Sequence, residues 1–536
     1  MDNTIDAIEE RRISLQGHLD AQKTQADRNR LGQFATPTLL ALDILSYALT
    51  LLPPREGVRF LDPAFGTGAF YAAARKVFQK KQIKEVRGFE IDPHYGTPAT
   101  SLWEDDGVRL ELTDFTREKP SPRFNLIICN PPYVRHHHLE SLEKTRLQRC
   151  TLDASGMRLS GMAGLYCYFM GLSHAWMADN AVAGWLIPSE FMDVNYGETV
   201  KRYLLHRVTL LRIHRFEPND VQFTDALVSS AVVWFKNAPP PRDHAVKFSF
   251  GGSLLNPKVS RSVSAQALFR EPKWTRFPNA GTRTGEIVPT LSDFFQIKRG
   301  IATGCNDFFI IEANKVAALG LPREVFHPIL PSPRYLPQDE IDAEEDGNPI
   351  IERRLLLLDT RIPEDEIKSR FPALWQYLEA GKARAVQERY LCRHRSPWYA
   401  QDKRAPAPII CTYMGRGDGK SRRPFRFIRN RSCATVANVY LAMYPTRILE
   451  GALKRDPALI DRIWQVLNAI TLEQLIGEGR VYGGGLHKLE PKELANVSAL
   501  AIAELVPDFR QKPSVRQLDL FGDEHGVFVR HGKAMR

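Results

Sequence analysis

The segment FLDPAFGTGAF, from Phe60 to Phe70, decides the fold of the first half of this chain. An apolar run ends at Asp62-Pro63, the turn Phe65-Gly66-Thr67-Gly68 follows, and a helical pattern starts behind it. Glycine after a first strand lets the backbone come close to a ligand at the carboxyl edge of a sheet. The turn is not the six-residue dinucleotide fingerprint. Taken alone, it leaves both a nucleotide site and a plain tight turn open.

Around this segment, strand-like and helix-like runs alternate, which predicts an α/β fold with a parallel sheet. Helical patterns cover Thr38–Leu52 and Leu165–Met177. The strands are expected at Val58–Leu61, Val86–Glu90, Leu126–Cys129, Ala183–Ile187, Leu210–Arg215 and Ser229–Phe235.

Acidic residues follow at successive strand ends. Glu90 comes about twenty residues after Gly68, where a carboxylate accepts hydrogen bonds from the two hydroxyls of a ribose. Asp114 can accept from an adenine amino group, while the adjacent Phe115 packs on the ring. Each acid alone would more often lie in a surface loop. In this order, they predict a pocket for an adenosine-bearing cofactor.

The next strand ends in Asn130-Pro131-Pro132-Tyr133, within FNLIICNPPYVRHHH. Two adjacent prolines donate no backbone N–H and stiffen the chain. Asn130 adds an amide and Tyr133 a flat ring. The combination favours a flat, hydrogen-bonding ligand.

Together these stretches resemble the γ class of DNA adenine-N6 methyltransferases, in which the cofactor motifs precede the catalytic motif and a target-recognition domain comes last. The resemblance covers most of the chain, and NPPY is its most specific piece. It rests on GQFATP (Gly32–Pro37), the glycine turn (Asp62–Gly68), Glu90, Asp114-Phe115, NPPY (Asn130–Tyr133), IPSEF (Ile187–Phe191) and FTDALVSSAVV (Phe223–Val233).

The resemblance implies a Rossmann-like methyltransferase sheet and S-adenosyl-L-methionine as the cofactor. The catalytic residues that it implies are Asn130, Pro131, Pro132, Tyr133 and Phe223, although an ordinary core role for Phe223 stays open. The cofactor-binding residues that it implies are Thr36, Pro37, Asp62, Pro63, Gly66, Gly68, Glu90, Asp114 and Phe115.

The chemistry explains the NPPY segment. The adenine amino nitrogen is a poor nucleophile that is buried in the duplex, so the base has to be flipped out. The side-chain oxygen of Asn130 and the backbone oxygen of Pro131 can then accept its hydrogens, which localises the lone pair without a strong base. Tyr133 offers a stacking face worth roughly 1–3 kcal/mol. Asn in place of the Ser usual in cytosine-N4 enzymes favours adenine.

The domain organisation follows the same resemblance. We expect a catalytic domain over residues 1–245, a connector over 246–288, a mixed α+β target-recognition domain over 289–505 and a flexible tail over 506–536. The start of the connector follows the proline-rich run NAPPPRDH, from Asn237 to His244.

A basic surplus points to a polyanionic partner. The 73 Lys and Arg residues against 62 acidic ones give a net charge of +11, which is weak support by itself. The run RGDGKSRRPFRFIRNR, Arg416 to Arg431, holds seven cationic residues and one acid. Because the acids that would neutralise it are missing, phosphate contact is preferred over a solvated face. The duplex-DNA contacts expected here are Lys420, Arg422, Arg423, Arg426, Arg429 and Arg431.

Two further partners are hypotheses. A methyltransferase of a restriction–modification system would work beside a separate cognate restriction endonuclease. Gln517-Leu518-Asp519-Leu520-Phe521 resembles the short motif by which bacterial replication proteins dock on the sliding clamp. The alternative is that Leu520 and Phe521 pack back on the recognition domain.

Other classes of protein fit less well. The seven cysteines form no CxxC pair, and His136-His137-His138 has no metal-spaced partners, so no metal site is expected. The absence of a signal-like start or a long apolar stretch predicts a cytoplasmic protein with no membrane partner.

The sequence therefore predicts a site-specific DNA adenine-N6 methyltransferase that uses S-adenosylmethionine. Two alternatives stay open. One is an RNA or protein-glutamine methyltransferase with the same NPPY chemistry, and the other is a DNA-binding module that only retains the fold.

Overall fold

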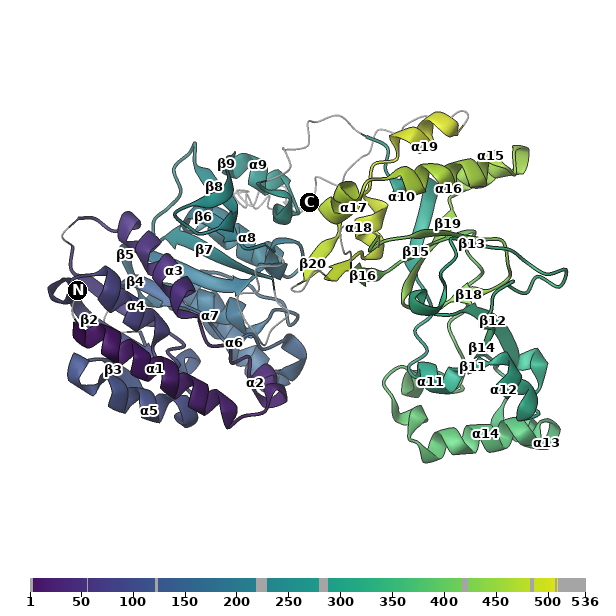
Figure 1. The fold of residues 1–536 in the computed structure, drawn as a ribbon, viewed down its shortest axis with the longest axis horizontal. Coiled ribbons are helices and arrows are strands. Elements are labelled where there is room, and N and C mark those ends of the chain that lie inside the picture. Colours follow the sequence, from purple (N-terminus) through teal and green to yellow (C-terminus); the bar gives the residue numbers. More distant parts are fainter. Residues whose placement is uncertain are drawn as a thin grey trace, which may run out of the picture. The chain divides into compact units, whose positions relative to one another are not determined.

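The computed structural model describes residues 3–54, 56–120, 124–217, 229–278, 288–416, 423–482, 486–506 and 509. They fall into two compact units, both shown in Figure 1. The first consists of Met1–Thr282 with Gly415–Pro424 and Gly479–Lys488, and the second of Arg283–Met414, Phe425–Glu478 and Leu489–Arg536.

The described residues of the first unit form a nine-stranded sheet of order β3-β2-β1-β4-β5-β7-β6-β8-β9. β1 to β5 pair in parallel, and β7 lies antiparallel between β5 and β6. Its strands are β1 Val58–Asp62, β2 Ile83–Phe89, β3 Arg109–Glu111, β4 Phe124–Cys129, β5 Met177–Pro188, β6 Thr209–Arg215, β7 Ser230–Lys236, β8 Ala245–Gly252 and β9 Pro257–Ser264.

The predicted α/β fold is confirmed, and each of the six expected strands has a counterpart in this sheet. The sheet is mixed rather than wholly parallel because β7 runs against its neighbours. The expected connector over residues 246–288 is wrong at its start. Residues 245–264 instead form β8 and β9, with β8 parallel to β6 and β9 antiparallel to β8.

Helices cover both faces of this sheet (Figure 1). The central strand β4 is buried on both faces, with Leu126 and Ile128 in one core cluster and Ile127 and Cys129 in the other. Such a strand reads as an unbroken apolar run, which made it recognisable in the sequence. The helices are α1 Asn3–Ala21, α2 Gln25–Leu31, α3 Thr38–Leu51, α4 Ala69–Val77, α5 Pro93–Trp103, α6 Ser141–Ser155, α7 Leu165–Ser173, α8 Gly197–His206 and α9 Ala265–Arg270.

The second unit is a mixed α+β structure, as predicted. One sheet has the order β10-β19-β15-β17-β13, and the other has the order β11-β14-β12-β18. Their strands are β10 Phe295–Arg299, β11 Ile310–Glu312, β12 Phe326–Leu330, β13 Glu340–Ile341, β14 Leu355–Leu358, β15 Ile409–Thr412, β17 Phe427–Asn430, β18 Thr435–Val436 and β19 Tyr440–Pro445.

The helices of this unit are mostly short. They are α10 Leu291–Phe294, α11 Asn306–Phe309, α12 Ala313–Ala318, α13 Glu364–Arg370, α14 Pro372–Ala383, α15 Arg447–Arg455, α16 Leu459–Ala469, α17 Leu472–Glu478, α18 Pro491–Ala495 and α19 Leu500–Leu505. A third sheet, β16-β21-β20, belongs to the first unit except for Met414. Its strands are β16 Met414–Arg416, β21 Leu486–Lys488 and β20 Arg480–Tyr482.

No described helix is both long and apolar enough to cross a bilayer.

Candidate active site

Three of the predicted site residues meet at one edge of the first sheet. β2, β1 and β4 are neighbours and run in parallel, so their carboxyl ends lie side by side. Asp62 ends β1, Glu90 follows β2 and Asn130 follows β4. This edge is where open α/β sheets bind ligands.

The glycine turn after β1 depends on backbone conformation and on space. Gly66 and Gly68 have φ values of 56° and 90°, which side chains other than hydrogen rarely allow. A Cβ on Gly68 would lie 2.5 Å from Trp103 Nε1, whereas a Cβ on Gly66 would meet nothing within 4 Å. Gly68 is therefore required for packing as well as for conformation, and Gly66 for conformation alone.

Glu90 ties this turn to the end of β2. Its Oε2 accepts a hydrogen bond of 2.9 Å from Gly66 N, and its Oε1 accepts one of 2.8 Å from Asp92 N. Burial raises the pKa of Glu90, although these backbone N–H donors oppose the shift. The next residue, Ile91, is 67% exposed. The sequence analysis did not single out this exposed apolar side chain.

Asp62 is almost fully buried at the base of the turn. Its Oδ1 accepts a hydrogen bond of 3.0 Å from Ala64 N. Burial, with a smaller contribution from the charge of Glu90, raises the pKa of Asp62 to about 8. The buried carboxyl is therefore largely protonated at neutral pH and would favour a cationic ligand that lets it ionise.

Asn130 has one satisfied end and one unsatisfied end. Its Nδ2 donates to Phe34 O at 2.9 Å and to Thr36 Oγ1 at 3.1 Å. Its Oδ1 is buried and has no hydrogen-bond partner among the described residues. Buried carbonyl oxygens are almost always paired, so this atom is the one in the site most in need of a donor.

The backbone of the GQFATP segment holds the NPPY segment. Tyr133 N donates to Gly32 O at 3.2 Å, and a Cβ on Gly32 would lie only 2.3 Å from Tyr133 N. The hydroxyl of Tyr133 donates to Leu186 O at 3.0 Å, and its ring centroid lies 5.7 Å from that of Phe34. The ring is 9% exposed, so it is fixed in place and largely covered.

A cavity lies at this junction, and several of the predicted residues line it. Thr36, Asp62, Gly66 and Asn130 are among them, whereas Pro37 is exposed outside it. Pro63 is buried beside Asp62 and does not line the cavity. The lining residues are Gln16, Phe34, Ala35, Thr36, Asp62, Ala64, Phe65, Gly66, Thr67, Ala69, Phe70 and Asn130.

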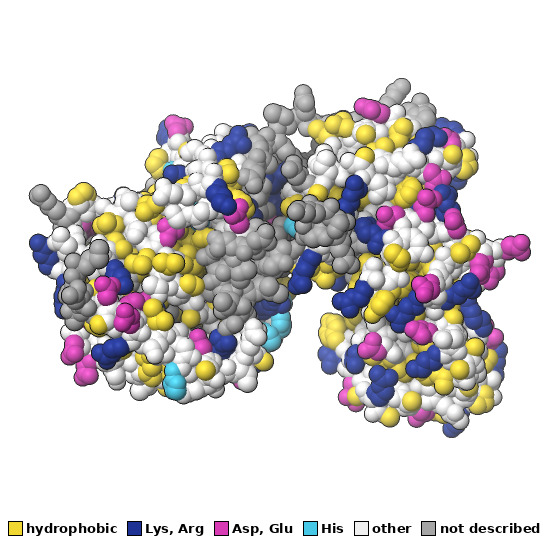
Figure 2. Space-filling model, viewed as in Figure 1, with side chains coloured by type: hydrophobic (Ala, Val, Ile, Leu, Met, Phe, Trp, Pro, Cys, Tyr) yellow, Lys and Arg dark blue, Asp and Glu magenta, His cyan; other side chains and the backbone are white. Residues whose placement is uncertain are grey.

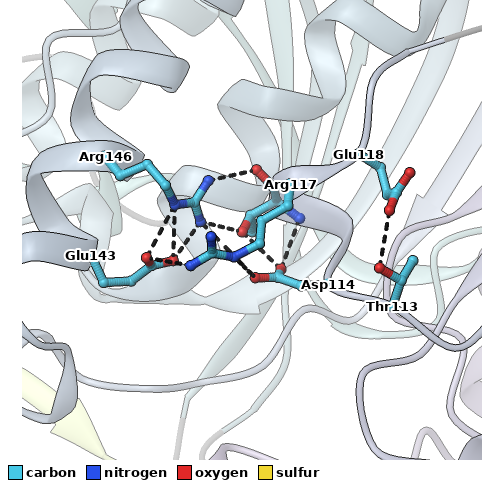
Figure 3. A network of polar contacts seen from close by, with 7 residues as sticks. Thr113, Asp114, Arg117, Glu118, Glu143 and Arg146 are labelled. Atoms are coloured by element: carbon cyan, nitrogen blue, oxygen red, sulfur yellow. Dashed lines mark hydrogen bonds and ion pairs between the residues drawn. The ribbon is translucent and has the colours of Figure 1, made fainter.

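Asp114 belongs to a polar network outside this cavity, drawn in Figure 3. Its Oδ1 accepts from Thr116 N at 2.9 Å and from Thr116 Oγ1 at 2.7 Å. Its Oδ2 accepts from Arg117 Nε at 3.2 Å, and Arg146 on α6 donates to Thr116 O at 2.8 Å. Arg117 and Arg146 both pair with Glu143. Asp114 therefore shapes its own loop, with lone pairs left for one more donor.

Phe115 is part of the core of the first unit, and its contact with a cofactor stays a prediction. Its ring is 3% exposed and packs against Phe89, Phe169 and Trp176 at centroid distances of 5.4, 5.4 and 5.7 Å. The sequence assigned this ring to the cofactor, but the structure places it in the core.

The reason given for DNA contact by the arginine run is wrong for three of its members. Arg426 pairs with Asp339, Arg429 with Asp461, and Arg431 with Glu340, Asp342 and Asp461. The neutralising acids come from distant parts of the second unit, over which acidic and basic side chains are interspersed in Figure 2. Arg423 is described, and Lys420 and Arg422 lie outside the described residues.

Phe223 and the segment Gln517–Phe521 lie outside the described residues. His136–His138 form a short 3₁₀ turn. Among the described residues, no three His, Cys, Asp or Glu side chains are grouped so that they could hold a metal ion.

Two protein-family models match parts of the chain. Residues 68–222 match the family model described as Eco57I restriction-modification methylase. Residues 280–521 match the one described as Type II methyltransferase M.Eco57I, C-terminal domain. The second match extends into residues for which the sequence analysis expected a tail.

Two curated relatives align over most of their own length. The chain is 27% identical over 486 residues to Type II methyltransferase M.XamI of Xanthomonas campestris pv. amaranthicola, covering 89% of this chain and 86% of the relative. It is 26% identical over 500 residues to Type II methyltransferase M.AccI of Acinetobacter calcoaceticus, covering 87% and 85%.

One solved structure has a similar fold over both units. The Type IIL restriction-modification enzyme MmeI in complex with DNA has a TM-score of 0.52 and 13% identity, covering 89% of this chain and 68% of that chain.

Proposed function

Since the chain belongs, through both of its matched regions, to the Eco57I-type restriction–modification methylases, we propose that it transfers a methyl group from S-adenosyl-L-methionine to N6 of adenine in a specific DNA sequence. The proposal goes beyond the family in naming the base, the atom and the residues responsible. Its partners would be duplex DNA and a separate restriction endonuclease that cuts the same sequence when it is unmethylated.

The observation that carries the proposal is the unpartnered oxygen of Asn130. An exocyclic amino group offers N–H donors, and the buried Oδ1 lacks a donor among the described residues. The other end of the amide is held by Phe34 O and Thr36 Oγ1, so the oxygen cannot turn away. A preorganised acceptor of this kind stabilises the charge that develops on an amino group under attack.

Pro131 and Pro132 support the same acceptor geometry. Neither can donate a backbone N–H, and their fixed φ keeps the chain in one path after β4. The backbone oxygen of Pro131 would accept the second amino hydrogen. Tyr133, fixed through Leu186 and Gly32, would support the ring of the extruded base, with Phe223 proposed on its other face. Extrusion is needed because the amino group is not reachable in a stacked duplex.

The residues that line the cavity and those at the neighbouring strand ends fit the cofactor. When it is bound, S-adenosylmethionine supplies a methyl group on a positively charged sulfur. Asp62, which is buried and short of counter-charge, favours a cation nearby. Glu90 would accept from the ribose hydroxyls, Ile91 would contact the adenine ring, and Asp114 would accept from the adenine amino group. Thr36 and the backbone of Gly66 and Gly68 would border the methionine part.

The experiment that tests the proposal uses the purified chain with S-adenosylmethionine labelled on its methyl group. The labelled methyl is offered to duplex DNA from a host that lacks the protein, to total RNA and to total protein. Digestion of the DNA to nucleosides followed by mass spectrometry is expected to place the label in N6-methyladenine. Label in N4-methylcytosine would refute the base assignment, and label only in RNA or protein would refute the substrate.

A further inference from the structure

Helix α1 is part of the cavity wall, a role that the sequence analysis did not assign to it. Gln16 on α1 lines the cavity together with Asp62 and Asn130. The helix is fixed against the glycine turn because Arg12 Nη1 donates to Thr67 Oγ1 at 3.2 Å. Arg12 is itself 3% exposed and pairs with Glu9 at 2.6 Å. Helix α1 is thereby held in place as one wall of the cavity.

The hydrogen bonds of this wall run in one direction. Arg12 has no acceptor, so Thr67 Oγ1 accepts from it and donates its own proton to Gln16 Oε1 at 2.7 Å. Gln16 Nε2 in turn donates to Asp20 Oδ1 at 2.9 Å. This series of hydrogen bonds fixes which end of the Gln16 amide is the oxygen and which is the nitrogen.

One donor is left over at the cavity. An amide nitrogen has two N–H groups, and Asp20 takes one of them from Gln16. The second has no partner among the described residues, and Gln16 lines the cavity. A remaining N–H matches an acceptor oxygen, such as that of a carboxylate, rather than a cation or an apolar group.

We propose that Gln16 donates a hydrogen bond to the carboxylate of the cofactor's amino-acid end, so that α1 recognises the methionine part of S-adenosylmethionine. The assignment rests on the proposed function, which supplies the cofactor. The amino-acid end is the one carboxylate that S-adenosylmethionine carries. Asn130, which follows β4 and lines another part of the same cavity, then remains free for the target base.

A pair of ligands separates recognition of the carboxylate from simple packing. S-adenosylmethionine has the amino-acid end, whereas 5′-methylthioadenosine keeps the adenosine and the sulfur but lacks that end. The dissociation constant of each is measured by titration calorimetry for the parent chain, for Gln16→Ala and for Gln16→Glu. Gln22→Ala is the matched control, since Gln22 directly follows α1, is exposed, pairs with His18 and does not line the cavity.

Gln16→Ala is expected to raise the dissociation constant of S-adenosylmethionine by about tenfold to a hundredfold, the usual loss when a hydrogen bond to a charged group is removed. Binding of 5′-methylthioadenosine should be unchanged. Gln16→Glu should weaken the binding of S-adenosylmethionine at least as much, because the carboxylate of the new side chain would then face the carboxylate of the ligand. Gln22→Ala should match the parent for both ligands.

Equal weakening of both ligands by Gln16→Ala would mean that α1 only shapes the pocket, and it would overturn the assignment. Unchanged binding of S-adenosylmethionine would overturn it as well. Because the readout is binding, a parent chain that binds the cofactor but methylates no adenine would refute the proposed function while this inference stands.

Discussion

Replacing Asn130 by Ala tests the centre of the proposed mechanism. The substitution removes the one buried side-chain oxygen at the cavity that lacks a partner among the described residues. Loss of one preorganised acceptor of this kind costs about 10²- to 10³-fold in kcat, or about 2.7–4 kcal/mol of barrier. Cofactor binding should change little, because Asn130 is expected to contact the base and not the cofactor.

The same substitution has a cost in stability that has to be separated from its effect on catalysis. Asn130 Nδ2 makes two hydrogen bonds, and each is worth about 1 kcal/mol net. We therefore expect the free energy of unfolding to fall by about 2 kcal/mol in urea titrations, which a stable chain tolerates.

Asn125→Ala is the matched control, because Asn125 lies on the same strand β4, at its opposite end. Its side chain accepts from Arg59 N at 2.8 Å and donates to Gly57 O at 2.8 Å. Asn125→Ala should lose similar stability and keep the parent kcat. If Asn130→Ala methylates at close to the parent rate, or if Asn125→Ala is equally inactive, the mechanism assigned to Asn130 is wrong.

Further predictions concern charge. Because burial raises the pKa of Asp62 to about 8, a cationic ligand should bind more tightly as pH rises from 7 to 9, and calorimetry should detect the release of a proton on binding. Asp62→Asn should abolish both effects. A ligand affinity of the parent chain that does not change with pH would contradict this prediction. The same raised pKa means that ionisation of Asp62 costs stability as pH rises from about 4 to about 8, so Asp62→Asn should gain stability over the parent across that window in thermal melts. Arg422→Ala should flatten the dependence of log DNA affinity on log salt concentration. Arg431→Ala should leave that slope unchanged and lower the melting temperature, because the charge of Arg431 is already neutralised by Glu340, Asp342 and Asp461. Equal slopes for both variants would mean that the whole arginine run is a solvated surface without DNA contacts. A peptide of residues 513–524 should bind a bacterial sliding clamp and lose binding when Leu520 and Phe521 become Ala; no binding, or binding that survives the change, leaves the motif as ordinary packing.

The features that the sequence predicted well are those set by neighbouring residues. β1, the glycine turn and α4 form one local unit, in which strand, positive-φ glycines and helix follow each other within a few residues. β4 was recognisable because both of its faces are buried and its last four residues, Leu126 to Cys129, are all apolar. Such patterns need no knowledge of the rest of the chain.

The features that the sequence missed depend on distant partners. β9 has mostly exposed residues and β3 only three, so neither carries an apolar pattern. Phe115 was assigned to the cofactor because its core neighbours Phe169 and Trp176 come more than fifty positions later. Arg431 lacked acids nearby in sequence, yet it meets Glu340 and Asp461 in space.

Contacts between residues far apart in the sequence also link the side-chain amide of Asn130 to the cavity. The amide of Asn130 is oriented by Phe34 O and Thr36 Oγ1, which come 96 and 94 positions earlier in the chain. Thr36 also lines the cavity proposed for the cofactor. Because one loop contacts both the cavity and the catalytic amide, a ligand that shifts Thr36 would also release or tighten the Asn130 side chain. The acceptor for the target base would therefore be fully set only when the loop that borders the cofactor is in place.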